Sequence, residues 1–278
     1  MIYTKQEEYE WVVGFIDGDG FMDLERVKSR DHFYYRPVLA ITQKEIKVLY
    51  KIKKILTIGR ISKRADGYYH YRIRSRRLFE QYLVPLFTKH PFLSNKKLQF
   101  QLIIRCLKIL NNYTGDNLQK QHCLNQFQLW IRKARSRHMP SKIKSLSPAW
   151  FVGFFDSEGC ISVQVRNSIS FKWRFVIKIT QSDKNYLLLV AIKDFLNVGR
   201  IYKERSNIYY WGFHSFKDLL KFRILMKKYP LKSEKYIQWI RFLKLLRIRD
   251  RNFQPSGKVQ KRFQRLLLSF QKQKRLKI

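Results

Sequence analysis

Two apolar runs of the chain have the length and composition of buried helices, and each ends in acidic residues beside a glycine. Residues 11–23 read WVVGFIDGDGFMD, and residues 150–162 read WFVGFFDSEGCIS. In front of the second run, Ser147 and Pro148 supply the N-cap and the first-turn proline that are typical of a helix start. The pattern therefore predicts two similar apolar helices in distant parts of the chain.

Directly after each apolar run, the pattern changes to the two-residue period of β-strands. In the second half, Ile161 and Val163 alternate with Ser162 and Gln164, and the next segment, 172–179, alternates apolar and mostly basic residues. This alternation predicts a sheet with one apolar face and one basic face.

The remainder of the second half continues as a helix, a strand pair and two more helices. The helix is predicted near 183–196 and the strand pair near 199–213. Ser215, followed three residues later by Asp218, predicts the start of the next helix through a capping box. The unit is therefore αββαββα.

The same unit occurs twice, because many matched residues recur at one nearly constant separation. The matches are Gly14 with Gly153, the triplets ITQ at 41–43 and 179–181 and GRI at 59–61 and 199–201, and Pro91, Ser94, Lys96 and Gln99 with Pro230, Ser233, Lys235 and Gln238. Chance similarity does not keep one register over such a length. The sequence thus predicts an α+β fold of two pseudo-symmetric αββαββα repeats with antiparallel sheets.

We divide the chain accordingly into four segments. They are a first repeat at 1–110, a connector at 111–146 with a helix near 118–135 and a basic linker after it, a second repeat at 147–250, and a basic C-terminal tail at 251–278. The tail pattern is compatible with either a basic amphipathic helix or an arm that binds nucleic acid.

Gly14 and Gly153 lie in the middle of the two apolar helices, where a glycine costs about 1 kcal/mol relative to alanine. The missing side chains suggest that the helices cross backbone against backbone and form the interface between the repeats. Asp19 and Glu158 would then meet at adjacent helix C-termini, where helix dipoles favour cations. Carboxylates among backbone carbonyls suit Mg²⁺, with Mn²⁺ as a plausible substitute.

Charge narrows the class of partner. The 278 residues include 58 Lys and Arg against 20 Asp and Glu, which leaves a net charge of +38 and indicates a polyanionic partner, above all nucleic acid. No apolar run approaches the roughly 20 residues that span a bilayer, so no membrane partner is expected. The three cysteines and six histidines are scattered, which argues against a disulfide framework and a zinc site.

The segments VVGFIDGDG at 12–20 and FVGFFDSEG at 151–159 resemble the nine-residue signature of the LAGLIDADG homing endonucleases, in their single-chain, two-repeat form. The resemblance extends over both repeats. It implies a monomer whose sheets form a saddle on double-stranded DNA, and metal-dependent cleavage of one phosphodiester bond in each strand.

The resemblance also implies roles for individual residues. It implies that Asp19 and Glu158, with the neighbouring Gly18 and Ser157, bind metal. The catalytic residues would be Asp19 and Glu158 together with Gln43, Gln181, Lys96 and Lys235. Asp17 and Asp156 would have structural roles at the helix ends. A further basic position of the family falls on Lys47 in the first repeat and on Asn185 in the second. The second repeat departs from the pattern at that point.

Alternation along the strands predicts which side chains face DNA, because a two-stranded ribbon fits the major groove. The candidates are Glu25, Tyr34, Arg36, Arg60, Arg64, Arg72 and Arg74 in the first repeat and Ser162, Gln164, Arg166, Lys172, Arg174, Lys178, Arg200 and Tyr202 in the second. The two sets differ, so we expect an asymmetric target.

These observations predict a site-specific DNA endonuclease. A maturase that binds intron RNA on the same scaffold is the alternative, and a basic structural protein such as a ribosomal component is a weaker one. The abundance of Lys, Ile, Phe, Tyr and Asn suits an AT-rich organellar gene, in a mitochondrion or a chloroplast.

Overall fold

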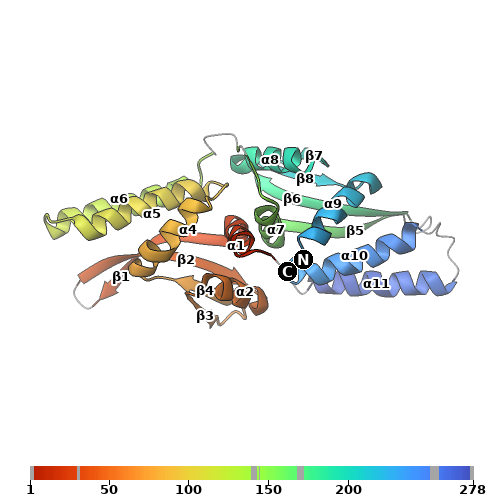
Figure 1. Cartoon of the computed structure of the whole chain (residues 1–278), viewed down its shortest axis with the longest axis horizontal. Helices are drawn as coiled ribbons and strands as arrows, with labels where there is room; N and C mark the ends of the chain where they lie inside the picture. The colour runs from red at the N-terminus through yellow and green to blue at the C-terminus, as the bar shows by residue number, and fades with distance from the viewer. Residues whose placement is uncertain are drawn as a thin grey trace.

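The computed structural model consists of two halves with the same architecture, each a four-stranded antiparallel sheet covered by helices (Figure 1). The strand orders are β1-β2-β4-β3 and β5-β6-β8-β7. The structure describes residues 3–29, 32–138, 143, 145–167, 172–250 and 257–275. The predicted α+β fold of two pseudo-symmetric repeats is confirmed.

In the first half, the elements are α1 (Lys5–Asp19), β1 (Gly20–Ser29), β2 (His32–Gln43), α2 (Ile46–Leu56), β3 (Arg60–Lys63), β4 (Tyr69–Ile73), α3 (Arg76–Leu78), a π-helical turn (Phe79–Leu83), α4 (Val84–Lys89), α5 (Lys96–Asn112) and α6 (Asn117–Ala134). The second half has α7 (Pro148–Glu158), β5 (Gly159–Asn167), β6 (Lys172–Ser182), a 3₁₀ turn (Asp183–Asn185), α8 (Tyr186–Leu196), β7 (Arg200–Arg205), β8 (Ile208–Phe213), α9 (Phe216–Lys228), α10 (Lys235–Asp250) and α11 (Gly257–Arg275). The predicted elements are therefore present in the predicted order.

Polar side chains cap the helix starts where the sequence indicated them. The Ser147 hydroxyl accepts a hydrogen bond from the amide of Trp150, with Pro148 in the first turn of α7. The Ser215 hydroxyl accepts from the amide of Asp218 at the start of α9. Both contacts satisfy amides that have no partner within the helix.

The two motif helices, α1 and α7, cross at their glycines. A Cβ atom on Gly14 would lie 2.0 Å from the carbonyl oxygen of Trp150, and one on Gly153 would lie 2.0 Å from the carbonyl oxygen of Trp11. Only backbone fits at this crossing, which confirms the predicted interface between the repeats. In Figure 1 both helices lie at the centre of the molecule, between the two sheets.

Each sheet has one face buried under helices. On β6, Trp173 and Phe175 point to the same side, because strand residues alternate. Their rings contact Phe263 of α11, at 4.7 Å between centroids, and Phe242 of α10, at 5.2 Å. The opposite face carries the polar and basic side chains, as the alternation predicted.

The connector helix and the tail helix are packed against their sheets. The Gln128 amide of α6 donates to the carbonyl of Leu24 at 2.5 Å, and Arg135, just after α6, donates to the carbonyl of Met22 at 3.0 Å. These contacts cover the edge strand β1, whose unpaired backbone groups could otherwise form hydrogen bonds with a strand of another chain. The tail between 257 and 275 is the helix α11, which packs on α10 and, through Phe263, on Trp173 of β6.

Part of the predicted basic linker, residues 139–142 and 144, lies outside the described residues, as do 251–256 and 276–278 of the tail. Within the described residues, no helix combines the length and apolarity needed to span a membrane.

Candidate active site and nucleic-acid interface

Asp17, near the end of α1, is a buried carboxylate that joins three parts of the molecule. It accepts hydrogen bonds from the amides of Leu93 and Ser94, at 2.8 and 3.2 Å, and from the Ser94 hydroxyl at 2.5 Å. The indole of Trp150, from the other repeat, donates to it at 2.9 Å. Burial raises the pKa of Asp17, and these donors oppose the rise. Its contacts are those of a structural residue.

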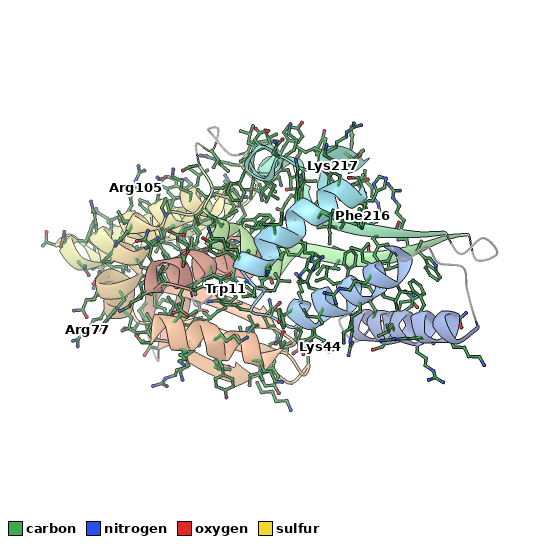
Figure 2. The ribbon with its side chains drawn as sticks, turned by 45° about the vertical axis from the view of Figure 1, so that its right-hand side comes forward. Trp11, Lys44, Arg77, Arg105, Phe216 and Lys217 are labelled. Carbon is green, nitrogen blue, oxygen red and sulfur yellow. The ribbon has the colours of Figure 1, made fainter. Side chains whose placement is uncertain are left out.

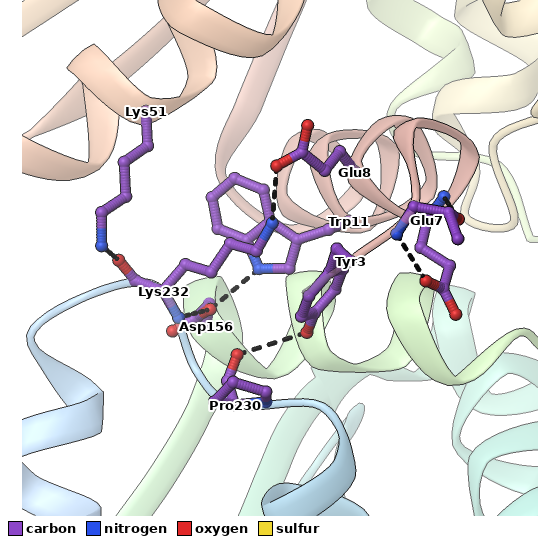
Figure 3. Close-up of polar contacts among 9 residues, drawn as sticks. Tyr3, Glu7, Glu8, Trp11, Lys51, Asp156, Pro230 and Lys232 are labelled. Carbon is purple, nitrogen blue, oxygen red and sulfur yellow. Dashed lines mark hydrogen bonds and ion pairs between the residues drawn. The ribbon is translucent and has the colours of Figure 1, made fainter. Parts of the chain in front are cut away.

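Asp156 repeats this arrangement in the second half. It accepts from the amides of Lys232 and Ser233, at 2.8 and 3.1 Å, and from the Ser233 hydroxyl at 2.5 Å. The indole of Trp11 donates to it at 2.9 Å, as Figure 3 shows. Each motif helix is thus tied to the loop before the last α-helices of its own repeat and to a tryptophan of the other repeat.

The C-terminal ends of the motif helices lie side by side. A Cβ atom on Gly18 would lie 1.9 Å from the hydroxyl oxygen of Ser157 and 2.9 Å from Cγ of Glu158. The carboxylates of Asp19 and Glu158 therefore belong to one small region between the repeats. Burial and, after it, the neighbouring Asp19 carboxylate raise the pKa of Glu158.

A lysine from each repeat binds the last carbonyls of its own motif helix. Lys96 Nζ donates to the carbonyls of Asp17 and Gly18, at 2.7 and 2.9 Å. Lys235 Nζ donates to those of Phe155 and Ser157, at 3.1 and 2.5 Å. The carbonyls of helix C-termini carry partial negative charge, so each ammonium group stabilises a helix end beside the acidic pair.

Lys96 is strongly influenced by its surroundings. Burial lowers the pKa of Lys96, while the carboxylates of Asp17, Glu158 and Asp19 act in the opposite direction. A buried lysine whose pKa is shifted beside two carboxylates is a feature of catalytic sites, where burial and charge adjust a group to its task.

The two glutamines at the ends of β2 and β6 have different partners. Gln43 Nε2 donates to Asp19 at 2.6 Å, whereas Gln181 Oε1 accepts from Asn185 Nδ2 at 2.9 Å. The other amide atom of Asn185, Oδ1, is buried without a partner among the described residues. Lys47, the counterpart of Asn185, is exposed. The sequence departure at Asn185 thus coincides with a structural difference between the halves.

A pocket of about 460 Å³ opens between the two repeats at this point. Asp19, Gln43 and Glu45 line it from the first repeat, and Ser157 and Lys235 line it from the second. Glu45 also accepts a hydrogen bond from the amide of Glu234, at 2.8 Å, and so connects the end of β2 to the start of α10. The pocket therefore brings together three of the six predicted catalytic residues, Asp19, Gln43 and Lys235. Glu158, Gln181 and Lys96 are not among the residues that line it.

The acidic pair fits a divalent metal by its chemistry. Two carboxylates are hard oxygen donors, and the carbonyls of Gly18 and Ser157, which accept from Lys96 and Lys235, each keep a second lone pair for a cation. A cation would also offset the charge of Asp19, which, after burial, raises the pKa of Glu158. Within the described residues, no three His, Cys, Asp or Glu side chains are grouped to hold a metal. Mg²⁺ commonly binds through one or two carboxylates and completes its shell with water and substrate phosphates.

The strand face of the first repeat gathers the predicted DNA contacts. Glu25 pairs with Arg36 at 3.0 Å and with Arg74 at 3.3 Å, so a single carboxylate orients two arginines. The register places Arg72 between Ala40 on β2 and Arg60 on β3, on the same face. Tyr34 is exposed on β2, and Arg64 lies just after β3 and pairs with Asp66.

The corresponding face of the second repeat carries different side chains and contacts. Lys178 pairs with Glu204 at 2.9 Å, Arg174 contacts His214, and Tyr202 stacks on Tyr210. The other candidates on this face are Gln164 and Arg200, which are exposed, and Ser162, which is 7% exposed and therefore least available to a ligand. The side chains of Arg166 and Lys172 lie outside the described residues.

The structure adds residues that the strand pattern did not single out. His70 on β4 contacts Thr42 at 2.8 Å and Arg64 at 2.9 Å. Burial, and then Arg72 and Arg64, lower the pKa of His70. His214 and Tyr210 occupy the second repeat's face in the same way. His70 on β4, Tyr210 on β8 and His214 just after β8 occupy alternate positions, which were the available signal; it was obscured because apolar and aromatic residues share those strands.

Comparison with known proteins identifies the sequence pattern. The family model described as LAGLIDADG endonuclease matches residues 12–107 and 151–246, once in each half. A curated relative from Schizosaccharomyces pombe, "Probable intron-encoded endonuclease Cox1-I1b", is 26% identical over 192 residues, which cover 67% of this chain and 49% of the relative. The chain spans about half the length of that relative, and less than half the length of two other relatives described as probable intron-encoded endonucleases.

Solved structures share the fold over nearly the whole chain. The LAGLIDADG homing endonuclease I-GzeII in complex with its DNA target has a TM-score of 0.82 and 20% identity, covering 93% of this chain and 96% of that one. I-SmaMI bound to uncleaved DNA target in the presence of calcium ions has a TM-score of 0.80 and 20% identity, covering 93% and 97%. At this level of identity, the similarity shows a common fold.

Proposed function

Because the chain belongs to the LAGLIDADG endonuclease family, we propose that it is a monomeric, site-specific homing endonuclease that cleaves both strands of a long, asymmetric DNA target. The observation that carries the proposal is the pairing of Asp19 and Glu158 at adjoining helix ends, in a chain of net charge +38. The fold shared with DNA-bound homing endonucleases supports it.

The strand faces would bind the duplex. The arginines that Glu25 orients are suited to bidentate contacts with guanine, whereas lysines such as Lys178 are suited to phosphates. Since the faces of the two repeats carry different side chains, each would read a different half of the target.

Asp19 and Glu158, with the carbonyls of Gly18 and Ser157, would hold Mg²⁺ or Mn²⁺ against the scissile phosphates. Such an ion would promote ionisation of water and offset the charge of the phosphate oxygens. Gln43 orients the Asp19 carboxylate through its 2.6 Å hydrogen bond. Lys96 and Lys235, which bind the carbonyls of Gly18 and Ser157, would place positive charge beside the reacting phosphates of separate strands.

The experiment is to find the target by cleavage of a randomised DNA library and then to assay the Asp19→Asn, Glu158→Gln double variant. We expect it to bind the target but to cleave it more than about a hundredfold more slowly, because electrostatic contributors to such reactions have effects of that size. Glu80→Gln with Asp194→Asn loses the same charge elsewhere and should cleave normally. Retained cleavage by the first variant would refute the metal assignment.

We also propose an organellar gene, on the basis of the composition and the intron-encoded relative. The alternative of an intron RNA maturase would be favoured if the double variant still supported splicing of its intron while the wild-type protein cleaved no DNA.

A further inference from the structure

Helices α10 and α11 enclose a groove of about 870 Å³, and every polar side chain that lines it among the described residues is basic. Lys244 and Arg247 line it from α10, and Lys261, Arg262 and Arg265 line it from α11. None of the five forms an ion pair in the part of the chain that the structure describes. Cations that converge without a counter-charge create a positive potential that attracts a polyanion.

This α10–α11 groove is distinct from the strand face. Phe242 of α10 and Phe263 of α11 pack against Phe175 and Trp173, which point to the apolar side of β6. The groove therefore belongs to the helical layer, on the opposite side of the sheet from Arg174. In Figure 1, α11 and the β5–β6 pair extend to the same end of the molecule.

The first repeat serves as an internal control for this groove. At the separation that relates Gly14 to Gly153, the buried Phe263 and Phe270 of α11 correspond to the buried Leu124 and Ile131 of α6. The same register pairs Lys244 and Arg247 with Arg105 and Lys108, but Lys261, Arg262 and Arg265 with His122, Cys123 and Gln126. The α5–α6 hairpin packs without those three cations, so packing does not explain them.

We propose that the α10–α11 groove is a second DNA site, which binds the phosphate backbone of a duplex segment beyond the one on the strand faces. Among the described residues, the rest of its lining is Ile248 and Leu266, which offer no side-chain amide, carboxylate or aromatic ring to read or stack bases. Binding there is independent of sequence. The inference rests on the proposed function, because a chain bound to its target holds flanking DNA at high effective concentration.

The test counts short random-sequence DNA duplexes bound per protein by sedimentation, and measures each affinity as salt is varied. The groove variant carries Lys261→Gln, Arg262→Gln and Arg265→Gln, three exposed positions where glutamine preserves helix propensity. The control carries Lys217→Gln, Lys221→Gln and Arg223→Gln on α9, with the same loss of charge; Figure 2 shows Lys217 on the outside of the molecule.

We expect two duplexes for the wild type and the α9 control and one for the groove variant. In the wild type, the second binding step should weaken with salt by about 0.9 log units per log unit for each phosphate neutralised. Equal stoichiometry in the wild type and the groove variant would overturn the proposal. So would a loss confined to RNA duplexes of the same length, which would make RNA the occupant.

The design separates the groove from the proposed function. If the wild type bound one duplex and the groove variant none, the groove would stand and the strand-face site would fail. If the groove variant bound one duplex and cleaved a selected target at the wild-type rate, both would stand.

Discussion

In the first repeat, Gln43 donates a hydrogen bond to the acidic pair at Asp19, whereas in the second repeat Gln181 is held by Asn185. By contrast, Asp17 and Asp156 keep the same partners almost atom for atom, each with two loop amides, a serine hydroxyl and a tryptophan indole from the other repeat. The repeats therefore agree where they hold the motif helices together and differ beside the pocket.

The difference has a physical cause. At the helix crossing, every substitution meets backbone at about 2 Å and every buried carboxylate needs all its donors, so little can change. Around the glutamines, side chains border an open pocket, and water or a ligand can replace a lost partner. The two halves of one scaffold can consequently acquire different chemistry.

The largest expected effect is a loss of stability at the crossing of α1 and α7, and it tests whether both repeats contribute equally to that crossing. Gly14→Ala and Gly153→Ala each place a methyl group 2.0 Å from a carbonyl oxygen and must separate α1 from α7. Each should lower the free energy of unfolding by more than about 3 kcal/mol, at or above the upper range for overpacked cores. Chemical denaturation measures it, with Gly257→Ala, which meets nothing within 4 Å, as the control. If only one of the two glycine variants lost stability, the helix crossing would not be symmetric.

The next effect separates the halves of the active site. Lys96→Met and Lys235→Met should each slow cleavage of one strand about a hundredfold, the typical size of a single electrostatic contribution, and so accumulate nicked DNA. Lys235→Met should be the more severe, because the second repeat has Asn185 in place of Lys47. Strand-resolved cleavage of a supercoiled plasmid under single-turnover conditions distinguishes the strands. Equal slowing of both strands by both variants would end the assignment of one lysine to each strand.

A smaller effect concerns the glutamines. Gln43→Ala removes a hydrogen bond to a carboxylate, worth about 1.5 kcal/mol, and should slow cleavage roughly tenfold. Gln181→Ala breaks, among the described residues, a hydrogen bond from Asn185 and none to the acidic pair, so it should slow cleavage less. In an Asn185→Lys background, Gln181 loses its partner, so the effects of Gln43→Ala and Gln181→Ala on the cleavage rate should become more alike. Single-turnover rates decide this, and a greater loss in Gln181→Ala would reverse the order of the two repeats.

The smallest effect is a pH dependence of stability in metal-free protein. Because the pKa of Glu158 is raised by burial and by Asp19, the folded state retains a proton that the unfolded chain has already released. Glu158 therefore makes its full contribution to the free energy of unfolding below its pKa in the unfolded chain. This contribution is lost as pH rises through its pKa in the folded state, by about 1.4 kcal/mol for each unit by which the two pKa values differ. The Glu158→Gln variant should not lose this stability as pH rises, because glutamine does not ionise.

Thermal unfolding against pH in a chelator measures the difference, with Glu204→Gln on β7 as the control. Above the raised pKa, Glu158→Gln should melt at a higher temperature than the wild type, and Mg²⁺ should narrow the gap by stabilising the ionised pair. Parallel curves for the wild type and Glu158→Gln would mean that Glu158 titrates alike in both states.

The sequence by itself determined the repeat, the order of helices and strands, and the crossing of the motif helices. Hydrophobic periodicity records burial directly, and a mid-helix glycine such as Gly14 is tolerated only where something needs its missing side chain. The strand-face candidates followed from the same alternation, which a β-strand imposes on every residue.

Only the tertiary structure decided which partners those residues meet. That Lys96 binds the carbonyls of α1, that Trp150 reaches Asp17, and that Gln181 is held by Asn185 depends on chain segments brought together by folding. The helix α11 had a local pattern that fitted either a packed helix or a free arm, and the contact between Phe263 and Trp173 decided for packing. Local patterns specify burial, but the identity of a long-range contact is a property of the assembled core.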